Sequence, residues 1–141
     1  MKADARTTRE IEAAIEKFAS AYKARQLQDL IGCFATDADV VLYGTGADEK
    51  RVGPEQVRVQ VERDWAQTES IEMSFTWMLI SAAGSVAWAA LDGAFNILAG
   101  GQQMALPARV SLVLEKRGGK WLIVHAHFST PAASQEPGSS I

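Results

Sequence analysis

The sequence predicts an α+β fold, with helices in the first half of the chain and a mainly antiparallel sheet in the second. Ile11, Ile15, Phe18 and Tyr22 recur at helical spacing, which places one apolar stripe along a helix. Later in the chain the pattern changes to long β-prone runs separated by glycine pairs or small-residue turns, at about residues 71–80, 86–98, 103–115 and 120–129. Helices followed by strands, rather than alternating with them, are typical of the α+β class.

Length and composition limit the classes of function. The chain has 141 residues, enough for one domain, and its 48% hydrophobic and 22% charged residues are typical of a globular protein. A formal net charge of -3 argues against nucleic-acid binding, which needs a basic surface. No apolar stretch is long enough to span a membrane, so we expect no membrane partner. The start of the chain has no apolar signal-peptide core and Cys33 is the only cysteine, which together predict a cytoplasmic setting.

Two further helices and a loose tail complete the expected organisation. Thr7 and Glu10 fit a capping box at the start of the first helix. A short helix follows near residues 27–34, and Gly53-Pro54 opens a third helix with proline at its first position. Residues 131–141 are rich in residues that break regular structure. We therefore expect one domain over residues 1–130 and a flexible tail over residues 131–141.

Two glycine pairs predict the register of the last three strands. Gly100-Gly101 and Gly118-Gly119 each fit a two-residue hairpin loop, in which the backbone often needs a positive φ. The first loop pairs Asp92 with Arg109, Ala90 with Ser111, and Trp88 with Val113. The second loop pairs Arg109 with Phe128, Ser111 with Ala126, and Val113 with Val124.

Both faces of this predicted sheet are apolar. Because side chains alternate along a strand, one face carries Trp88, Ala90, Asp92, Arg109, Ser111, Val113, Val124, Ala126 and Phe128, and we expect it to line a pocket. The opposite face carries Val110, Leu112, Trp121, Ile123 and His125. Helices can cover only one side, so the second apolar face predicts a homodimer packed sheet to sheet.

Two stretches of the sequence resemble a known superfamily. Residues 109–114 and the run 119–129, with its His125-Ala126-His127, are similar to the closing strands of SnoaL-like proteins and of the calcium/calmodulin-dependent protein kinase II association domain. Residues 29–40 and Gly53-Pro54-Glu55 resemble the family's second helix, first strand and third-helix start. The resemblance covers about residues 8–130. It implies a cone-shaped, nuclear-transport-factor-2-like (NTF2-like), cystatin-like roll, in which three N-terminal helices pack on a curved sheet, as a homodimer or higher oligomer.

The catalytic groups of ketosteroid isomerase, the best-known enzyme of this superfamily, are not matched. That enzyme uses a carboxylate base, a tyrosine and a protonated carboxylic acid. The similarity places these groups at Leu42, Phe18 and Ser111, which supply none of them, so we expect no such isomerase activity. In the kinase association domain, the arginine that matches Arg109 lies in a pocket for small carboxylates. A second arginine of that pocket falls at Ala90 and is lost.

The candidate ligand-binding residues follow from the register and the helix stripe. Asp92 and Arg109 are expected to face the pocket, where they either orient a ligand or only satisfy each other's charge. The remaining candidates are Tyr22, Trp88, Ser111, Phe128 and Leu42. No catalytic residue is identified. His125 and His127 share a face without an evident third ligand, so we expect neither a metal site nor a cofactor.

Two functions from different classes remain open. The first is a SnoaL-like protein that binds a small organic ligand of unknown identity, with isomerase, cyclase or dehydratase chemistry. The alternative is a non-catalytic, hub-like oligomerisation or binding module whose pocket is vestigial or regulatory. The Arg109–Asp92 pair favours the first function, and the missing catalytic groups favour the second.

Overall fold

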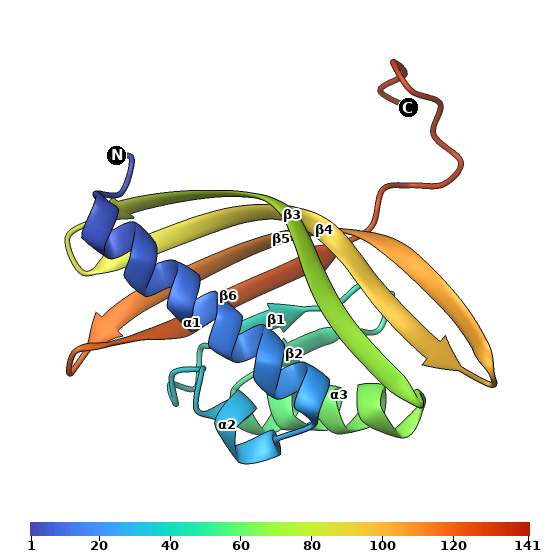
Figure 1. The fold of residues 1–141 in the computed structure, drawn as a ribbon, viewed down its shortest axis with the longest axis horizontal. Coiled ribbons are helices and arrows are strands. Elements are labelled where there is room, and N and C mark those ends of the chain that lie inside the picture. The colour runs from blue at the N-terminus through green and yellow to red at the C-terminus, as the bar shows by residue number, and fades with distance from the viewer.

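A six-stranded sheet curves around three helices in the computed structural model, which describes residues 1–141 (Figure 1). The elements in chain order are α1 (Ala5–Ala24), α2 (Leu27–Ile31), β1 (Val41–Tyr43), β2 (Lys50–Val52), α3 (Pro54–Ala66), β3 (Ser70–Ala83), β4 (Val86–Ala99), β5 (Gln102–Arg117) and β6 (Lys120–Ser129). The strand order is β2-β1-β6-β5-β4-β3, and only β1 and β6 run parallel. The α+β prediction is confirmed.

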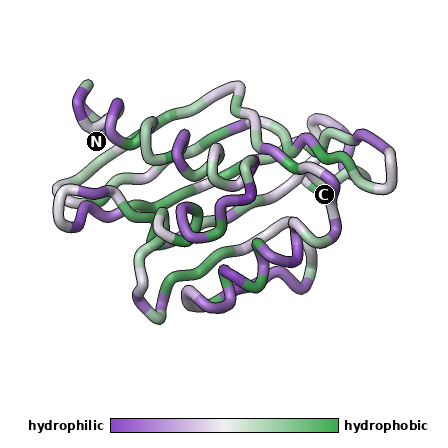
Figure 2. Tube along the Cα trace, turned by 60° about the horizontal axis from the view of Figure 1, so that its bottom comes forward, coloured by the Kyte–Doolittle hydropathy of each residue, from purple (hydrophilic) through white to green (hydrophobic).

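The long helices begin at residues suited to a first turn. α1 follows Asp4, whose carboxylate accepts a hydrogen bond from the Thr7 backbone N–H at 2.7 Å. The predicted cap at Thr7 is therefore wrong, because Asp4 satisfies that free donor and starts the helix earlier. α3 begins at Pro54 after Gly53, which has a φ of 85°, as the sequence predicts. Figure 2 shows hydrophilic and hydrophobic residues alternating along the helices, whereas the strands are hydrophobic over long stretches.

The β4–β5 hairpin has the predicted register. Gly100 and Gly101 form its turn with φ values of 58° and 75°, a conformation that glycine adopts without steric cost. The expected pairs of Asp92 with Arg109, Ala90 with Ser111, and Trp88 with Val113 are all present.

The β5–β6 hairpin departs from the predicted register after a β-bulge. Pairing follows the Gly118-Gly119 turn as far as Leu114 and Ile123, but Val113 then faces His125 instead of Val124. The bulge places one extra residue in β6, which moves every later side chain to the other face. Beyond it, Ser111 faces His127, Val110 faces Phe128, and Arg109 faces Ser129, so the predicted pairs of Arg109 with Phe128 and Ser111 with Ala126 are wrong.

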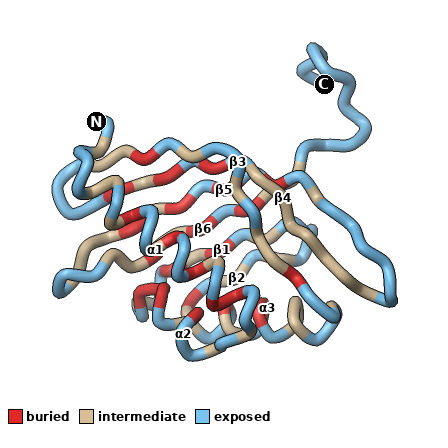
Figure 3. Tube along the Cα trace, viewed as in Figure 1, coloured by how far each residue is buried: buried red, intermediate tan, exposed pale blue.

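The helices cover the sheet face that was predicted to be open. Leu91, Val110 and Leu112 are buried, whereas Asp92 and Arg109, which alternate with them, are exposed. Figure 3 shows this alternation of buried and exposed residues along the strands. The predicted assignment of the two faces is therefore wrong. Since both faces are apolar, alternation alone did not distinguish the side that packs against the helices.

The other side of the sheet, which we call the open face, shares only His125 with the five residues predicted for the dimer face. Val110, Leu112 and Ile123 belong to the core, and Trp121 packs at the edge of that core. The open face instead carries Trp77, Leu79, Trp88, Ala90, Asp92, Arg109, Ser111, Val113, His125, His127 and Tyr43.

A bend divides the sheet into a packed end and a hollow end. The β3–β4 register shifts between Phe75 and Trp77, opposite Gly93, and Figure 1 shows both strands turning sharply midway. A Cβ at Gly93 would collide with the backbone oxygen of Ser74, so the close approach of the two strands requires glycine. The bend directs the far halves of β3 and β4 around the space beneath α1 and α3.

After Ser129 the chain leaves the sheet. Residues 131–141 contain no helix or strand, and all of them are exposed (Figure 3). No helix is both long and apolar enough to cross a membrane.

Candidate functional site

A cavity of about 240 Å³ lies between α1, α3 and the hollow end of the sheet. Its walls are largely aromatic and aliphatic. The ring centroid of Phe128 lies 6.3 Å from that of Phe18 and 5.9 Å from that of Phe95, so three elements contribute to one aromatic wall. The other apolar lining residues are Tyr22, Phe34, Leu42, Val61, Ile71, Met73, Ile97 and Leu106. An engineered apolar cavity of ~150 Å³ holds benzene, so this one has room for a somewhat larger molecule.

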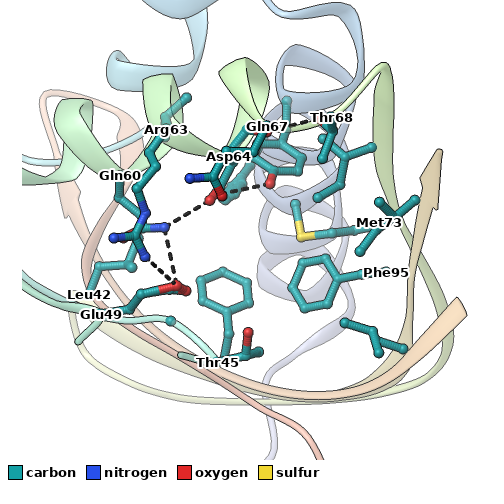
Figure 4. A pocket seen from close by; sticks show the side chains of 18 of the residues that line it. Leu42, Thr45, Glu49, Gln60, Arg63, Asp64, Gln67, Thr68, Met73 and Phe95 are labelled. Carbon is teal, nitrogen blue, oxygen red and sulfur yellow. Dashed lines mark hydrogen bonds and ion pairs between the residues drawn. The ribbon is translucent and has the colours of Figure 1, made fainter. Parts of the chain in front are cut away.

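One wall of the cavity is polar, and α3 supplies Gln60, Arg63 and Asp64 to it. The Tyr22 hydroxyl of α1 donates a hydrogen bond to Asp64 Oδ2 at 2.8 Å, and the Gln60 side-chain amide donates to Asp64 Oδ1 at 2.8 Å. Figure 4 shows Asp64, Gln60 and Glu49 on the side of the cavity opposite Met73 and Phe95. The cavity therefore has a carboxylate-bearing wall facing an apolar wall.

Asp64 is a partly buried carboxylate without an ion-pair partner. Both of its hydrogen-bond donors are uncharged, and no lysine, arginine or histidine lies within salt-bridge distance of it. Burial raises the pKa of Asp64, although the hydrogen bonds from Tyr22 and Gln60 oppose the rise. Burial also raises the pKa of Tyr22, and the adjacent Asp64 charge adds to this effect, so the phenol remains protonated. A carboxylate whose pKa is raised in this way is better suited to accept and return a proton than an ordinary surface carboxylate.

Gln60 holds two carboxylates together at the cavity wall. It is only 4% exposed, and its carbonyl oxygen accepts a hydrogen bond from Arg51 Nε at 2.8 Å. The amide nitrogen Nε2 points the other way, to Asp64 Oδ1 at 2.8 Å and to Glu49 Oε2 at 3.3 Å, so the contacts on both sides agree on the orientation of the amide. Arg51 lies in the edge strand β2, so the β1–β2 hairpin takes part in arranging the site.

The rim of the cavity is closed by ion pairs between the β1–β2 loop and α3. Arg63 binds both carboxylate oxygens of Asp48, at 2.8 and 3.2 Å, and Glu49 Oε2 at 3.3 Å. These contacts lower the pKa of Asp48. The Glu49 side chain lies over Gly44 and Gly46, where a Cβ would crowd it. Glu49 is consequently held with its carboxylate at the cavity.

The ends of α1 and α3 are tied together beside the site. Arg25 ends α1 in the left-handed conformation with a φ of 57°, and its guanidinium donates to the backbone oxygens of Trp65 at 2.7 Å and Thr68 at 2.9 Å. The Trp65 indole N–H donates to the Tyr22 backbone oxygen at 3.1 Å. These bonds satisfy carbonyl groups at both helix ends and bring Tyr22 to Asp64.

The structure separates the predicted site residues into two groups. Tyr22, Phe128 and Leu42 line the cavity. Asp92, Arg109 and Ser111 instead line a separate hollow of about 250 Å³ on the open face, together with His127, and Trp88 lines neither space. The prediction that Asp92, Arg109, Ser111 and Trp88 face the pocket is wrong, because the helices pack on the opposite side of the sheet.

Sequence reasoning missed the polar residues of the cavity wall other than Tyr22, and for two of them, Gln60 and Asp64, the sequence contains a signal. Their signal is visible on the third helix, because each directly precedes a member of the apolar stripe, Val61 or Trp65. Two polar residues four positions apart lie on the same face of a helix, and beside such a stripe they lie at the border between the core-facing side and the side that faces an adjoining space. That pattern, in a chain expected to have a pocket, marks them as candidates.

The two histidines lie on the open face rather than in the cavity. The His127 ring packs against that of Tyr43 with a centroid distance of 5.1 Å. No group of three or more histidine, cysteine, aspartate or glutamate side chains is arranged to hold a metal ion. Cys33 is buried, and burial raises the pKa of its thiol, so it stays protonated away from the cavity.

Comparisons with known proteins agree with this architecture. The family model of the SnoaL-like domain matches residues 11–133. The chain is 19% identical to a "putative dehydratase" of the NTF2-like family from Streptomyces avermitilis, with a TM-score of 0.81 and coverage of 89% of this chain and 96% of that one. It is 12% identical to a "putative scytalone dehydratase" from Novosphingobium aromaticivorans, with a TM-score of 0.79 and coverage of 89% and 85%.

A third structure carries a different name. A "putative calcium/calmodulin dependent protein kinase II association domain" from Xanthomonas campestris is 24% identical, with a TM-score of 0.80 and coverage of 94% of this chain and 95% of that one. At these identities the likeness shows a shared fold, which hosts proteins named for different functions. No curated protein matches the chain.

Proposed function

Because the chain belongs to the SnoaL-like domain family, we propose that its cavity binds a small, largely apolar organic molecule. We propose further that Asp64 takes a proton from one atom of that ligand and returns it to another. The observation that carries the proposal is the unpaired carboxylate of Asp64 in the wall of an aromatic cavity. A carboxylate whose pKa is raised by burial is suited to general acid–base work.

The proposed step needs no group beyond the residues of the cavity. Asp64 uses two of its roughly four lone-pair sites for Tyr22 and Gln60, which leaves acceptor capacity for a ligand proton. It takes a proton from the carbon next to a ligand carbonyl, and the C–H electron pair moves into the bond between that carbon and the carbonyl carbon. Return of that proton to another carbon gives isomerisation. Its delivery to a departing β-hydroxyl gives dehydration, with water as the second product and Asp64 regenerated.

The names of related structures support a reaction of this class. Two of the structures similar to this chain bear dehydratase names, and elimination of water is one outcome of the proton transfer described for Asp64. Their low sequence identity leaves the substrate of this chain to be determined by the shape and charge of its own cavity.

A hydrogen-exchange experiment tests the proposal without knowledge of the substrate. The uncharged ketone 2-indanone, incubated with the protein in D₂O, should exchange its α-hydrogens faster than in buffer, as followed by NMR. Asp64→Asn should return the rate to that of buffer while 2-indanone still binds. Binding without accelerated exchange in the wild type would support the non-catalytic binding module instead.

A cavity-filling variant locates the binding. Leu106 lines the cavity from β5, so Leu106→Trp should occupy the space and abolish the thermal stabilisation that 2-indanone gives the wild type. Persistent stabilisation of this variant would place the ligand elsewhere on the protein and contradict the proposal.

We also propose that the protein forms a homodimer through the open face. Trp77 and Leu79 on that face are each 50% exposed, an unusual state for large apolar side chains at the centre of long strands. The cross-strand pair of Asp92 and Arg109 can make the face self-complementary, because a two-fold axis that passes between them would place Asp92 of each copy opposite Arg109 of the other. Packing of two sheets would cover the apolar residues.

Sedimentation measurements test the dimer. Leu79→Glu should yield monomers, because it places an unpaired charge within the interface. Val59→Glu is the matched control, because Val59 is 45% exposed and lies on α3, away from the open face. A wild type that remains monomeric at micromolar concentration would contradict this proposal.

A further inference from the structure

We infer that the cavity selects cationic and uncharged ligands against carboxylates, and that Asp64 makes the selection. This inference rests on the proposed ligand-binding function and adds the charge of the ligand to it. It is opposite to the preference for carboxylates that the resemblance of Arg109 implies, because Arg109 lies on the open face.

The charged side chains of the cavity wall are Glu49, Arg63 and Asp64, which together have a net negative charge when ionised. The Arg63 guanidinium is occupied, since it binds Asp48 through two hydrogen bonds and also contacts Glu49. Asp64 has only the neutral donors Tyr22 and Gln60. The unpaired charge of the cavity is therefore a negative one.

The hydrogen-bond donors next to Asp64 are also committed, whereas Thr45 and Gln67 elsewhere on the wall offer only uncharged donors. The Gln60 amide donates to Asp64 and Glu49, the Tyr22 hydroxyl to Asp64, and the Thr68 hydroxyl to the Asp64 backbone oxygen at 2.8 Å. Glu49 Oε2 and Asp64 Oδ1 lie within 3.3 Å of the same nitrogen, Gln60 Nε2. A ligand carboxylate would lose its hydration beside two like charges without gaining a cationic partner.

A ligand ammonium group, unlike a carboxylate, is attracted by the charges of the cavity wall. Asp64 supplies the counter-charge, and Glu49, whose side chain is 12% exposed, adds a second carboxylate. The faces of Phe18, Phe95 and Phe128 also attract cations. An uncharged hydroxyl or carbonyl compound is neither attracted nor repelled by these carboxylates. Its affinity should therefore lie between that of an ammonium ligand and that of a carboxylate ligand.

Three ligands with one apolar body provide the test. We expect 2-phenylethylamine to bind more tightly than 2-phenylethanol at pH 7.5, and 3-phenylpropionate to bind about tenfold more weakly than the amine or worse, as measured by calorimetry. Asp64→Asn should reduce the affinity for the amine most of the way to that for the alcohol, because only Glu49 then remains to attract the ammonium. Glu62→Gln, which removes an exposed carboxylate from the same helix outside the cavity, should leave the order unchanged.

The outcomes separate this inference from the function on which it rests. Equal or tighter binding of 3-phenylpropionate than of the amine would overturn the charge selection while leaving the cavity a binding site. An amine preference that is undiminished in Asp64→Asn would overturn the role of Asp64. Failure of all three ligands to bind the wild type would overturn the proposed function itself. The wild-type ranking decides the charge selection even if Asp64→Asn fails to fold.

Discussion

Carboxylates at the two ends of the sheet have opposite electrostatic environments. At the packed end, Glu10 of α1 accepts hydrogen bonds from Trp121 Nε1 at 2.8 Å and Lys116 Nζ at 3.2 Å, and these bonds lower its pKa. At the hollow end, burial raises the pKa of Asp64, which has only uncharged partners. The first carboxylate joins a helix to the sheet, whereas the second keeps its charge available to a ligand.

The two ends of the sheet also differ in how tightly their apolar side chains are packed. Leu114 and Leu106 both belong to β5, but Leu114 is fully buried at the packed end whereas Leu106 is partly exposed beside the cavity. The bend at Gly93 lies between the corresponding halves of β4. The free energy of unfolding should therefore depend mainly on the packed end. Residues at the hollow end could then be substituted to suit a ligand at little cost in stability.

The largest expected effect is loss of the bend itself. Gly93→Ala places a methyl group against the backbone oxygen of Ser74, so the strands must separate, at a cost of about 3 kcal/mol in unfolding free energy. Gly32→Ala is the control, because Gly32 has a helical φ of -64° and its new Cβ would only crowd Gln28 O, at 3.2 Å. Urea denaturation compares the two. A Gly93 variant as stable as the wild type would show that β3 and β4 separate without difficulty.

The two leucines of β5 give the next largest effect. Leu114→Ala should lower the unfolding free energy by about 2–3 kcal/mol, because it leaves a void in close packing. Leu106→Ala should cost about 1 kcal/mol, because its side chain already borders empty space. Urea denaturation with equal m-values checks the comparison. Equal losses would mean that the hollow end contributes to stability as much as the packed end does.

The sequence predicted the framework better than the site, for physical reasons visible in these same strands. Glycine pairs determine turn geometry locally, so the Asp92–Arg109 register was predictable. The bulge beside Val113 depends on contacts between strands, and no turn residue marks it in the sequence. The side covered by helices depends on tertiary packing, which alternating apolar residues on both faces leave undetermined. This second limit alone misplaced four of the seven predicted pocket residues, because the bulge shifts only β6.

The two carboxylates should also give pH dependences of opposite sign. The folded-state pKa of Asp64 is raised, so the native state binds more protons than the unfolded state, and ionisation reduces stability as the pH rises through that pKa. Asp64→Asn should therefore be more stable than the wild type at pH 8, with the gap closing as the pH falls toward about 4, the unfolded pKa.

Glu10→Gln is the matched variant at the packed end. The folded-state pKa of Glu10 is lowered, so its contribution is present above the unfolded pKa and is lost as the pH falls through the folded one. This variant should be less stable than the wild type at pH 8 and equal to it in acid. Thermal unfolding between pH 3 and pH 8 measures both differences. Curves of the same sign would contradict the contrast between the two ends.

The smallest expected effect concerns Arg51, which donates a hydrogen bond to Gln60 from outside the cavity. Arg51→Met keeps much of the side-chain bulk but removes the donor at 2.8 Å from the Gln60 carbonyl oxygen, at a cost of about 1 kcal/mol in unfolding free energy. The Gln60 amide should not flip, because that would turn its oxygen toward Glu49 and Asp64. The preference for 2-phenylethylamine should therefore persist, and it should strengthen slightly because a nearby cation is gone. A variant that loses stability and the amine preference together would show that Arg51, rather than the two carboxylates, holds the amide in place.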